Sequence, residues 1–489
     1  MHKVRFAIVI AATIAAPAFG QARGPEVQRY VKVDAPVVAL THVRVIDGTG
    51  AAAREDQTII LRNGKIDAVG IAGSVTVPQE AQVLDLRGYT VIPGIVGMHN
   101  HLFYSASMLV DSDGNNVPPG RWFAELPFSG PRLYLAAGVT TMRTTGSVEP
   151  YGDLNLKKQI DANQIPGPKM DVTGPYLEGA GNLFGQVHTL TGPDDARRQV
   201  NYWADQGVTS IKAYMHITRA ELGAAIEEAH KRGMKITGHL CSVGYREAVE
   251  LGIDDFEHGP VLTDAEFFAG KQPDVCPPGR SAAQPWLKME ISSPQVQDLI
   301  HFLIAHGVAV TSTLPVFESI VPGRPVLPAR VADAMSPESK ASYLSAHVRA
   351  VPPSGGSSTP FAALFKREME FELAFAKAGG LLLAGPDPTG IGGVLPGFGD
   401  QREIELLVEA GFTPLEAIHI ATANGAQYLG QADRIGTIAA GKQADLVVIR
   451  GDPSKDIADI EKVEIVFRDG VGFDSQKLID SVRGQVGIR

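Results

Sequence analysis

The chain has 489 residues, of which 44% are hydrophobic and 20% charged, so it can bury an ordinary core. Its 54 acidic and 44 basic residues give a formal net charge of -10. An acidic chain without basic runs argues against nucleic acid and anionic membrane surfaces as partners. A mean hydropathy of +0.02 argues against both disorder and a polytopic membrane protein. We expect a small-molecule substrate, and association into homo-oligomers is left open.

Residues 1–20 have the pattern of a cleavable secretory signal peptide. Lys3 and Arg5 precede an apolar run over residues 6–16, and Ala18 and Gly20 offer small residues at a cleavage site. The run is shorter than the ~20 apolar residues of a permanent membrane span. We therefore expect a secreted or periplasmic protein with no membrane attachment after cleavage. An uncleaved N-terminal anchor is the alternative.

The two cysteines, Cys241 and Cys276, are too few for a disulfide scaffold or a cysteine-based zinc finger. They form at most one bridge, and the sequence leaves open whether they do. Cys241 follows His239 by two residues, and we expect it to be a buried apolar thiol rather than a metal ligand.

Strand-like segments lie towards both ends of the chain. Residues 37–46, 58–69, 444–450 and 463–467 are rich in β-branched residues and are followed or interrupted by Asp-Gly or Asn-Gly turn signals. We expect one small β-sandwich domain built from residues 37–90 and 431–475, with the segment between them inserted into it.

The segment over residues 91–430 alternates short apolar strands with amphipathic helices, which predicts a parallel (β/α)8 barrel of the TIM type in an α/β protein. Helix starts are signalled by Thr218 with Glu221 and by Thr413 with Glu416. Two stretches rich in Pro, Gly and Ser, residues 263–293 and 322–360, are expected to be long loops. The expected barrel strands are residues 91–98, 139–143, 169–172, 210–213, 235–237, 255–257, 308–311 and 381–384.

The first expected barrel strand ends in two histidines, His99 and His101. Because alternate residues of a strand project to the same face, both imidazoles point into the mouth of the barrel. This is the C-terminal face, where such barrels carry their chemistry. The pair therefore predicts half of a metal site.

Four further polar residues follow later strands of the expected barrel and fall at this same end: Lys212, His239, His258 and Asp387. Taken singly, each is typical of a structural hydrogen bond or a helix cap. Together, imidazoles and a carboxylate suit divalent zinc, manganese or cobalt. A lysine beside such ions has a lowered pKa, and its neutral amine can trap a small electrophile.

At this point the chain resembles the amidohydrolase superfamily, in the branch with imidazolonepropionase-like proteins and metal-dependent prolidases. The resemblance runs from about residue 37 to about residue 471. It is carried by five motifs: PGIVGMHNH at residues 93–101, AAGVTTMR at 136–143, DDFEHG at 254–259, GFTPLEAIHIATANGAQYLG at 411–430 and GTIAAGKQADLVVI at 436–449.

The resemblance implies a centre of two divalent metal ions, zinc first, with manganese or cobalt as alternatives. His99 and His101 would bind the more buried ion, and His239 and His258 the second. Lys212 would be carbamylated by carbon dioxide and link the two ions. Asp387 would contact the first ion and act as general base and then as general acid. His188 would polarise the scissile carbonyl, as a histidine after the third strand does in prolidase-like members.

Substrate contacts are expected from Tyr214 and His216, which follow Lys212 on one loop, and from Tyr104, which follows the two histidines. Any of the three could hold a substrate carboxylate or ring. The alternative is that they pack the rim of the barrel.

The function expected is that of an exported, metal-dependent amidohydrolase that cleaves the amide bond of a dipeptide or an N-acyl amino acid. A second enzymatic hypothesis is the opening of a cyclic amide, imidazolone or lactone. A single-metal hydrolase with an unmodified Lys212 is a third. A binding protein that keeps the fold without the reaction belongs to another class, and the presence of all six expected ligands counts against it.

Overall fold

A computed structural model describes residues 23–106, 122–182, 184–278, 281–351 and 359–489. The expected signal peptide, residues 1–20, lies outside the described residues. Within the described part of the chain, no helix combines the length and the apolar character that crossing a membrane requires.

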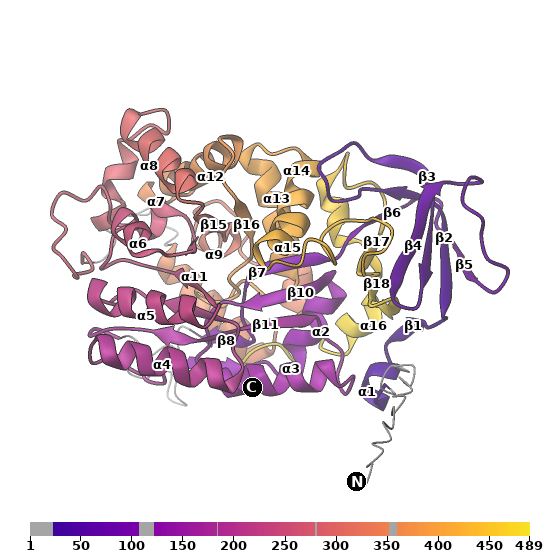
Figure 1. The fold of residues 1–489 in the computed structure, drawn as a ribbon, viewed down its shortest axis with the longest axis horizontal. Coiled ribbons are helices and arrows are strands. Elements are labelled where there is room, and N and C mark those ends of the chain that lie inside the picture. Colours follow the sequence, from indigo (N-terminus) through magenta and orange to yellow (C-terminus); the bar gives the residue numbers. More distant parts are fainter. Residues whose placement is uncertain (1–22, 107–121, 183, 279–280, 352–358) are drawn as a thin grey trace, which may run out of the picture.

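Eight parallel strands form the barrel, and each pairs with the next in chain order (Figure 1). The amide of Asp387, just after the last strand, donates to the carbonyl of His99 at the end of the first (3.0 Å), so the two outer strands meet and the barrel closes at this end. The predicted (β/α)8 fold is confirmed. The strands are β7 (Ile95–Asn100), β10 (Val139–Thr144), β11 (Lys169–Leu177), β12 (Ser210–Ala213), β13 (Lys235–Gly238), β14 (Asp255–Glu257), β15 (Ala309–Ser312) and β16 (Leu382–Ala384).

The first expected barrel strand, residues 91–98, is two strands in the structure. Tyr89–Pro93 (β6) pairs with β17 (Leu446–Arg450) of the second sheet, and only β7 enters the barrel. The break falls at Gly94, where a Cβ atom would lie 2.0 Å from Oγ1 of Thr140. A continuous apolar run does not reveal such a close approach, so the expectation of one strand was wrong.

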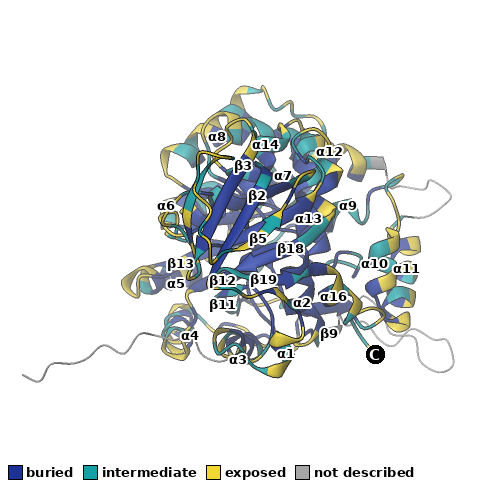
Figure 2. Ribbon diagram, turned by 90° about the vertical axis from the view of Figure 1, so that its right-hand side faces the viewer, coloured by how far each residue is buried: buried dark blue, intermediate teal, exposed yellow. Residues whose placement is uncertain are grey.

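Helices cover the outside of the barrel, with their exposed faces outward and the strands buried inside (Figure 2). The capping box expected at Thr218 is present: its amide donates to Glu221 (2.9 Å) and its hydroxyl accepts from the Glu221 amide (3.3 Å). Thr413 and Glu416 form the second box. The larger helices are α2 (Ser129–Ala136), α3 (Pro150–Asp161), α4 (Pro193–Gln206), α5 (Arg219–Lys231), α6 (Tyr245–Leu251), α8 (Pro294–Ala305), α12 (Thr359–Lys377) and α13 (Phe398–Ala410).

The other helical segments of the described residues vary in length. They are α1 (Pro25–Gln28), α7 (Pro260–Thr263), α9 (Leu314–Glu318), α10 (Ala329–Ala334), α11 (Pro337–Ala350), α14 (Pro414–His419), α15 (Gly425–Tyr428), α16 (Ser475–Asp480) and the 3-10 segments Ser281–Leu287 and Ile457–Glu461. A π-helical turn, Ile420–Asn424, joins α14 to α15.

The stretch 322–360, expected to be a loop, instead contains two helices, α10 and α11. Pro328 and Pro337 stand at their N-terminal ends, where a missing N–H costs nothing. Ser336 caps α11 by accepting from the Ser339 amide (3.1 Å). A proline-rich composition therefore does not distinguish a loop from helices that begin at a proline. In the described part of the stretch 263–293, which leaves out residues 279 and 280, the chain is loop apart from the end of α7 and the 3-10 segment Ser281–Leu287.

A second sheet combines strands from both ends of the chain and lies at the right of Figure 1. Its order is β1-β19-β18-β17-β6-β2-β3-β4, with β5 beside β2. It has its own apolar core, which includes Val38, Leu40 and Phe467. The remaining strands are β1 (Val31–Val33), β2 (Val37–Val45), β3 (Arg54–Arg62), β4 (Lys65–Ile71), β5 (Gln82–Asp85), β18 (Val463–Arg468) and β19 (Val471–Asp474).

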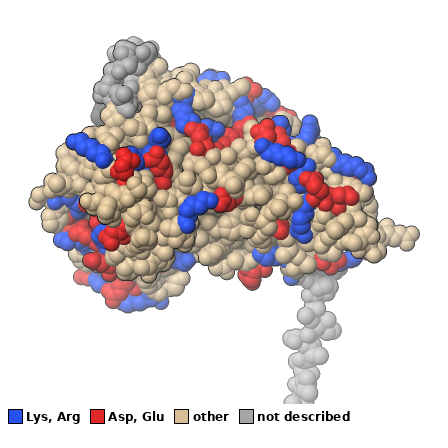
Figure 3. All heavy atoms as spheres, turned by 90° about the horizontal axis from the view of Figure 1, so that it is seen from above, with Lys and Arg blue, Asp and Glu red and all other residues tan. Residues whose placement is uncertain are grey.

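Two features lie near the C-terminal ends of the barrel strands. β8 (Phe103–Ala106) follows His101 by two residues and pairs antiparallel with β9 (Trp122–Glu125). Cys241, in the loop after β13, forms a disulfide with Cys276, and their Cα atoms lie 4.9 Å apart. The bridge that the sequence left open is therefore made, and Cys241 has no thiol to offer a metal. On the face seen in Figure 3, acidic and basic side chains are interspersed.

Candidate active site

Three side chains converge at the C-terminal end of the barrel. His99, on β7, and His101, directly after it, are each 1% exposed, and Asp387 comes three residues after β16. Oδ1 of Asp387 lies 3.7 Å from Nε2 of His99 and 3.4 Å from Nε2 of His101. Ligand atoms from all three residues lie within 4.8 Å of one another. This arrangement could hold a metal ion.

Both imidazoles are fixed through their other ring nitrogen. Nδ1 of His99 donates to Oε2 of Glu257 (2.6 Å), and Nδ1 of His101 donates to the carbonyl of Gly146 (3.0 Å). In a neutral imidazole this leaves Nε2 with its lone pair free of a proton. Burial keeps both rings neutral, because it lowers the pKa of His101 and lowers that of His99 well below its ordinary value; Lys212 lowers the pKa of His99 further.

Asp387 is held against the first barrel strand by unusual backbone geometry. Its φ of 46° lies in the left-handed region, and a Cβ atom on Gly385 would lie 2.2 Å from the His99 amide nitrogen. Glycine therefore lets β16 approach β7 closely. Burial raises the pKa of the Asp387 carboxyl, but the neighbouring His99, His101 and Lys212 lower it more, so the carboxyl is ionised.

Lys212, on β12, lies beside these ligands. Its side chain is 1% exposed and its Nζ atom lies 3.3 Å from Nε2 of His99. Burial lowers the pKa of this amine to about 8, against the opposing effect of Glu257 and Asp387. Gly146 faces the lysine stem, since a Cβ atom there would lie 3.1 Å from Cδ of Lys212. A substantial fraction of the amine is therefore neutral near neutral pH.

His258 and His239 continue the cluster. The ring of His258 lies 4.6 Å from that of His99 and 4.5 Å from that of His239, measured between centroids. Nδ1 of His258 lies 2.7 Å from the hydroxyl oxygen of Thr313 and 3.9 Å from Oδ2 of Asp387. Burial, and then His239, lower the pKa of His258 well below its ordinary value. The structure thus gathers all six expected ligands around one end of the barrel.

A buried ionic network beneath the cluster was missed by sequence reasoning. Nη2 of Arg143 donates to Asp255 and to Glu257, both at 2.8 Å, and its Nε donates to the Met98 carbonyl (2.8 Å). The three charged side chains are at most 1% exposed. Since Glu257 in turn accepts from His99, Arg143 fixes the carboxylate that orients a candidate ligand. The signal was available in part: Arg143 ends a barrel strand, and Glu257 precedes His258.

Two of the other expected site residues turn towards protein partners. His188 is half exposed, and its Nε2 lies 2.8 Å from Oδ2 of Asp195 at the start of α4. Tyr104 is 1% exposed and its hydroxyl donates to the carbonyl of Ser339 (3.3 Å). Its ring belongs to a buried apolar cluster with Leu133, Tyr343 and Phe398.

Tyr214 and His216 lie closer to the candidate ligands. The Tyr214 ring stands 4.9 Å from the His239 ring and 4.7 Å from that of Tyr176. His216 is partly exposed, with Nδ1 3.3 Å from Glu178. Tyr214 belongs to an aromatic group that leads from His101 to His239: Phe103, Phe123, Tyr176, Phe184 and Tyr214.

Comparison with known proteins agrees with this fold. The model of the amidohydrolase family matches residues 90–471. This match covers the barrel and includes His99, His101 and Asp387. The protein belongs to the amidohydrolase family, which makes it a hydrolase acting on carbon–nitrogen bonds.

Individual relatives are distant. An N-substituted formamide deformylase of Arthrobacter pascens is 28% identical over 108 residues, and a dihydroorotase of Anaeromyxobacter dehalogenans is 32% identical over 110. These matches cover 18% and 22% of this chain and 19% and 22% of the relatives, so the chain matches only about a fifth of their length. The crystal structure of a Xaa-Pro dipeptidase with bound methionine superposes with a TM-score of 0.65 at 19% identity, covering 90% of this chain and all of that one. That likeness shows the fold.

Proposed function

We propose that the protein is an exported, metal-dependent amidohydrolase that cleaves the amide bond of a dipeptide or an N-acyl amino acid. The observation that carries the proposal is the convergence of His99, His101 and Asp387, whose ligand atoms lie within 4.8 Å of one another. Two of these ligands are neutral imidazoles with their Nε2 atoms kept available by bonds at Nδ1.

The residues fit a divalent metal centre. Two imidazoles and one carboxylate are the ligand types that zinc takes in catalytic sites, and manganese and cobalt accept them as well. His99, His101 and Asp387 would hold one ion, and His239 and His258 would bind a second. Bound divalent ions would supply Lewis acidity, lowering the pKa of water and polarising a carbonyl.

Lys212 would contribute as a carbamate. Its neutral amine nitrogen forms a bond to the carbon of carbon dioxide and releases a proton, which leaves an anionic carbamate with two oxygen ligands. The lowered pKa, about 8, supports this step because it provides the neutral amine. The position of Nζ, 3.3 Å from Nε2 of a candidate ligand, supports it further. A carbamate would also replace an unfavourable cation next to bound metal by an anion.

Asp387 is suited to carry the proton. Its carboxylate is ionised and lies beside Nε2 of His99 and His101, so it can accept a proton from the attacking water and return it to the leaving amine. Thr389 donates to Oδ1 (2.7 Å), which fixes the carboxylate for this exchange.

His188 would polarise the scissile carbonyl. To reach a substrate, its ring would have to leave Asp195, to which it is bonded at 2.8 Å. We expect this exchange of partners on substrate binding, because the half-exposed ring is not packed in place. A His188→Asn variant should then lose kcat by about 100-fold or more, the usual cost of one oxyanion donor, with its metal content unchanged.

Dipeptides and N-acyl amino acids are the first substrates to test. The fold likeness to a Xaa-Pro dipeptidase and the match to a deformylase support linear amides. The match to dihydroorotases keeps the opening of a cyclic amide, imidazolone or lactone as the second candidate. The aromatic group beside His101 and His239 favours a substrate with an apolar side chain, and Tyr214 and His216 would contact it.

Export is supported by the disulfide between Cys241 and Cys276. Disulfides persist in secreted and periplasmic proteins and are rare in the reducing cytosol. The bridge therefore agrees with the signal-peptide pattern of residues 1–20.

The test is a hydrolysis screen of the metal-loaded protein against dipeptides, N-acyl amino acids and cyclic amides, with release of amine as the readout. We expect turnover of a linear amide that a chelator abolishes and a divalent ion restores. An Asp387→Asn variant should be inactive while remaining folded. Turnover of cyclic amides alone would move the assignment to the second candidate. Turnover that survives complete removal of metal would contradict the proposal.

A further inference from the structure

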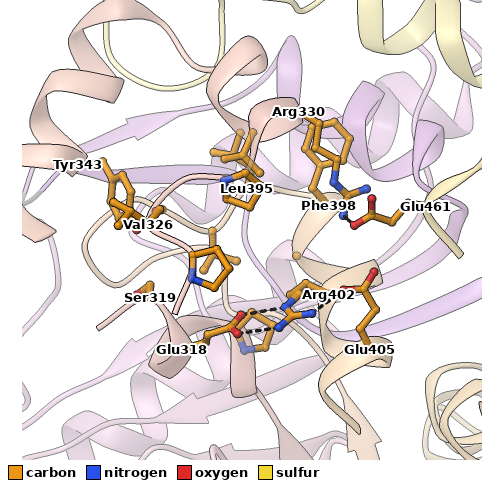
Figure 4. A pocket seen from close by; sticks show the side chains of 17 residues that line it. Glu318, Ser319, Val326, Arg330, Tyr343, Leu395, Phe398, Arg402, Glu405 and Glu461 are labelled. Carbon is orange, nitrogen blue, oxygen red and sulfur yellow. Dashed lines mark hydrogen bonds and ion pairs between the residues drawn. The ribbon is translucent and has the colours of Figure 1, made fainter. Parts of the chain in front are cut away.

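A cavity of about 230 Å3 is lined by residues of α9, α10, α11 and α13 and of the loops beside them (Figure 4). Much of its wall is apolar. The apolar lining includes Pro315, Val326, Val331, Tyr343, Leu395 and Phe398. Three acidic and two basic side chains complete it: Glu318, Glu405, Glu461, Arg330 and Arg402. None of these is a candidate metal ligand or proton carrier.

Both guanidinium groups of the cavity are already engaged by carboxylates. Arg402 donates from Nε and Nη2 to the two oxygens of Glu318 (2.9 and 2.7 Å) and from Nη1 to Glu405 (2.7 Å). Arg330 pairs with Glu461 (2.6 Å) and stacks over the Phe398 ring. An anionic ligand would have to displace these partners, so the cavity does not favour one.

The carboxylate of Glu405, by contrast, is not fully satisfied. Oε1 of Glu405 is buried without an N–H or hydroxyl donor among the described residues, and its side chain contacts the Glu461 carboxyl, while Oε2 accepts from Arg402. The side chain is only 11% exposed. Burial, opposed by Arg402, raises the pKa of Glu405, and the nearby Glu461 carboxyl raises it further. A buried carboxylate oxygen without a donor is unfavourable, and a cationic donor placed against it would relieve that cost.

We propose that this cavity binds a small organic ammonium ion. The ammonium group donates to Oε1 of Glu405 beside Glu461, and the apolar body packs on Val326, Tyr343 and Leu395. Three carboxylates and two guanidinium groups line the cavity, and a third guanidinium, that of Arg324, reaches Glu318 from outside the lining (3.5 Å). The volume is below the about 300–1,000 Å3 of sites for drug-sized ligands, which limits the ligand to a single ring or a short chain.

Benzylamine is a suitable probe, because it combines one ring with a primary ammonium group. Isothermal titration calorimetry of the full-length protein at pH 8 should give saturable binding at one site. Benzyl alcohol, of the same shape without the charge, and benzoate, of the opposite charge, should bind at least about tenfold more weakly, because hydrogen bonds to a charged partner are the stronger ones.

Three variants locate the probe. Glu405→Gln should weaken benzylamine binding by about tenfold or more, since a hydrogen bond to a charged partner is lost. Glu338→Gln, an equal change of charge at an exposed residue of α11 outside the cavity, should leave binding unchanged. Val326→Trp, at a position 42% exposed on the rim, fills the cavity without changing its charge and should also abolish binding. This variant carries the test if Glu405→Gln does not fold.

An Asp387→Asn variant separates this cavity from the candidate metal centre, and benzylamine should bind it as it binds the unaltered protein. Equal binding of benzylamine and benzyl alcohol would overturn the proposal, as would binding that survives both Glu405→Gln and Val326→Trp. Loss of binding in Asp387→Asn alone would assign the amine to the barrel site. No saturable binding at millimolar benzylamine would also overturn the proposal.

Discussion

Nδ1 of His99 lies 2.6 Å from Oε2 of Glu257, although 158 positions separate the two residues in the chain. Glu257 ends β14, and the next residue, His258, belongs to the candidate metal ligands. One short strand thus orients a ligand of β7 and supplies the neighbouring ligand itself. A carboxylate that accepts from a metal-binding imidazole fixes its tautomer and orientation.

Glu257→Gln should therefore weaken metal binding. The amide can still contact the ring, but it lacks the charge that makes the imidazole a stronger ligand. We expect metal affinity to fall by about 10–100-fold, measured by competition with a coloured chelator. Activity should return at high metal concentration. Glu250→Gln, at an exposed position, is the matched control, and equal affinities for the two variants would contradict this role of Glu257.

Arg143→Ala should destabilise the fold rather than the site alone. It leaves Asp255 and Glu257 buried without their cation, and breaking such a buried network typically costs about 3–5 kcal/mol. Chemical denaturation of the metal-free proteins should show this loss in the free energy of unfolding. Arg87→Ala removes an exposed pair with Asp85 and should leave stability unchanged. Equal stability of the two variants would show that the buried network contributes nothing.

The contacts of Ser312 indicate that two buried glutamates share a proton. Its hydroxyl oxygen lies 2.8 Å from Oε2 of Glu372 and 2.5 Å from Oε1 of Glu403. A hydroxyl has one proton to donate, so one of the two carboxyl groups must be protonated and donate to Ser312. Burial raises the pKa of Glu403 to about 8 and that of Glu372 well above its ordinary value.

Stability should consequently fall as the pH rises from about 5 to 8. Over this window the folded protein retains a proton on Glu403 that the unfolded chain, with the ordinary pKa of 4.5, has lost. The stabilisation is complete below the unfolded pKa and is lost as the pH approaches the folded pKa. Glu403→Gln keeps a neutral group there, so its urea midpoint should depend less on pH than that of the unaltered protein. Parallel pH profiles would contradict the shared proton.

The disulfide should stabilise the region beside the candidate site. It closes a loop between residues 35 positions apart, and loop-closure entropy assigns such a bridge about 3–4 kcal/mol. A Cys241→Ala, Cys276→Ala double variant should lose this stability, and a reductant should lower the unaltered protein to the same level. The reductant should have no effect on the double variant. If a reductant that can reach the disulfide during unfolding left the free energy of unfolding of the unaltered protein unchanged, this would contradict the estimate.

The fold was largely predictable because short apolar strands alternate with well-signalled helices. Strands β12 and β14 match the expected residues 210–213 and 255–257. The break at Gly94 was not predictable, because it depends on contact with Thr140 on another strand. The helices α10 and α11 were missed because their prolines stand at the N-terminal ends, where proline favours a helix instead of breaking it.

The candidate ligands could be predicted because barrel topology brings the ends of all strands together, whatever their distance in sequence. The direction of side chains outside the strands could not be predicted. His188 turns to Asp195 and Tyr104 to Ser339, and these partners are set by packing that the local sequence does not encode. The Arg143 network escaped for the same reason, since its carboxylates lie 112 and 114 positions away in the chain.

The proposed two-ion centre is tested most directly by metal content, measured by mass spectrometry on protein purified without chelators. The unaltered protein should carry about two divalent ions per chain, and a Lys212→Ala variant should carry fewer. One ion per chain in both proteins would indicate a single-metal hydrolase with an unmodified lysine. No bound ion in protein that remains folded would contradict the account and favour a binding protein.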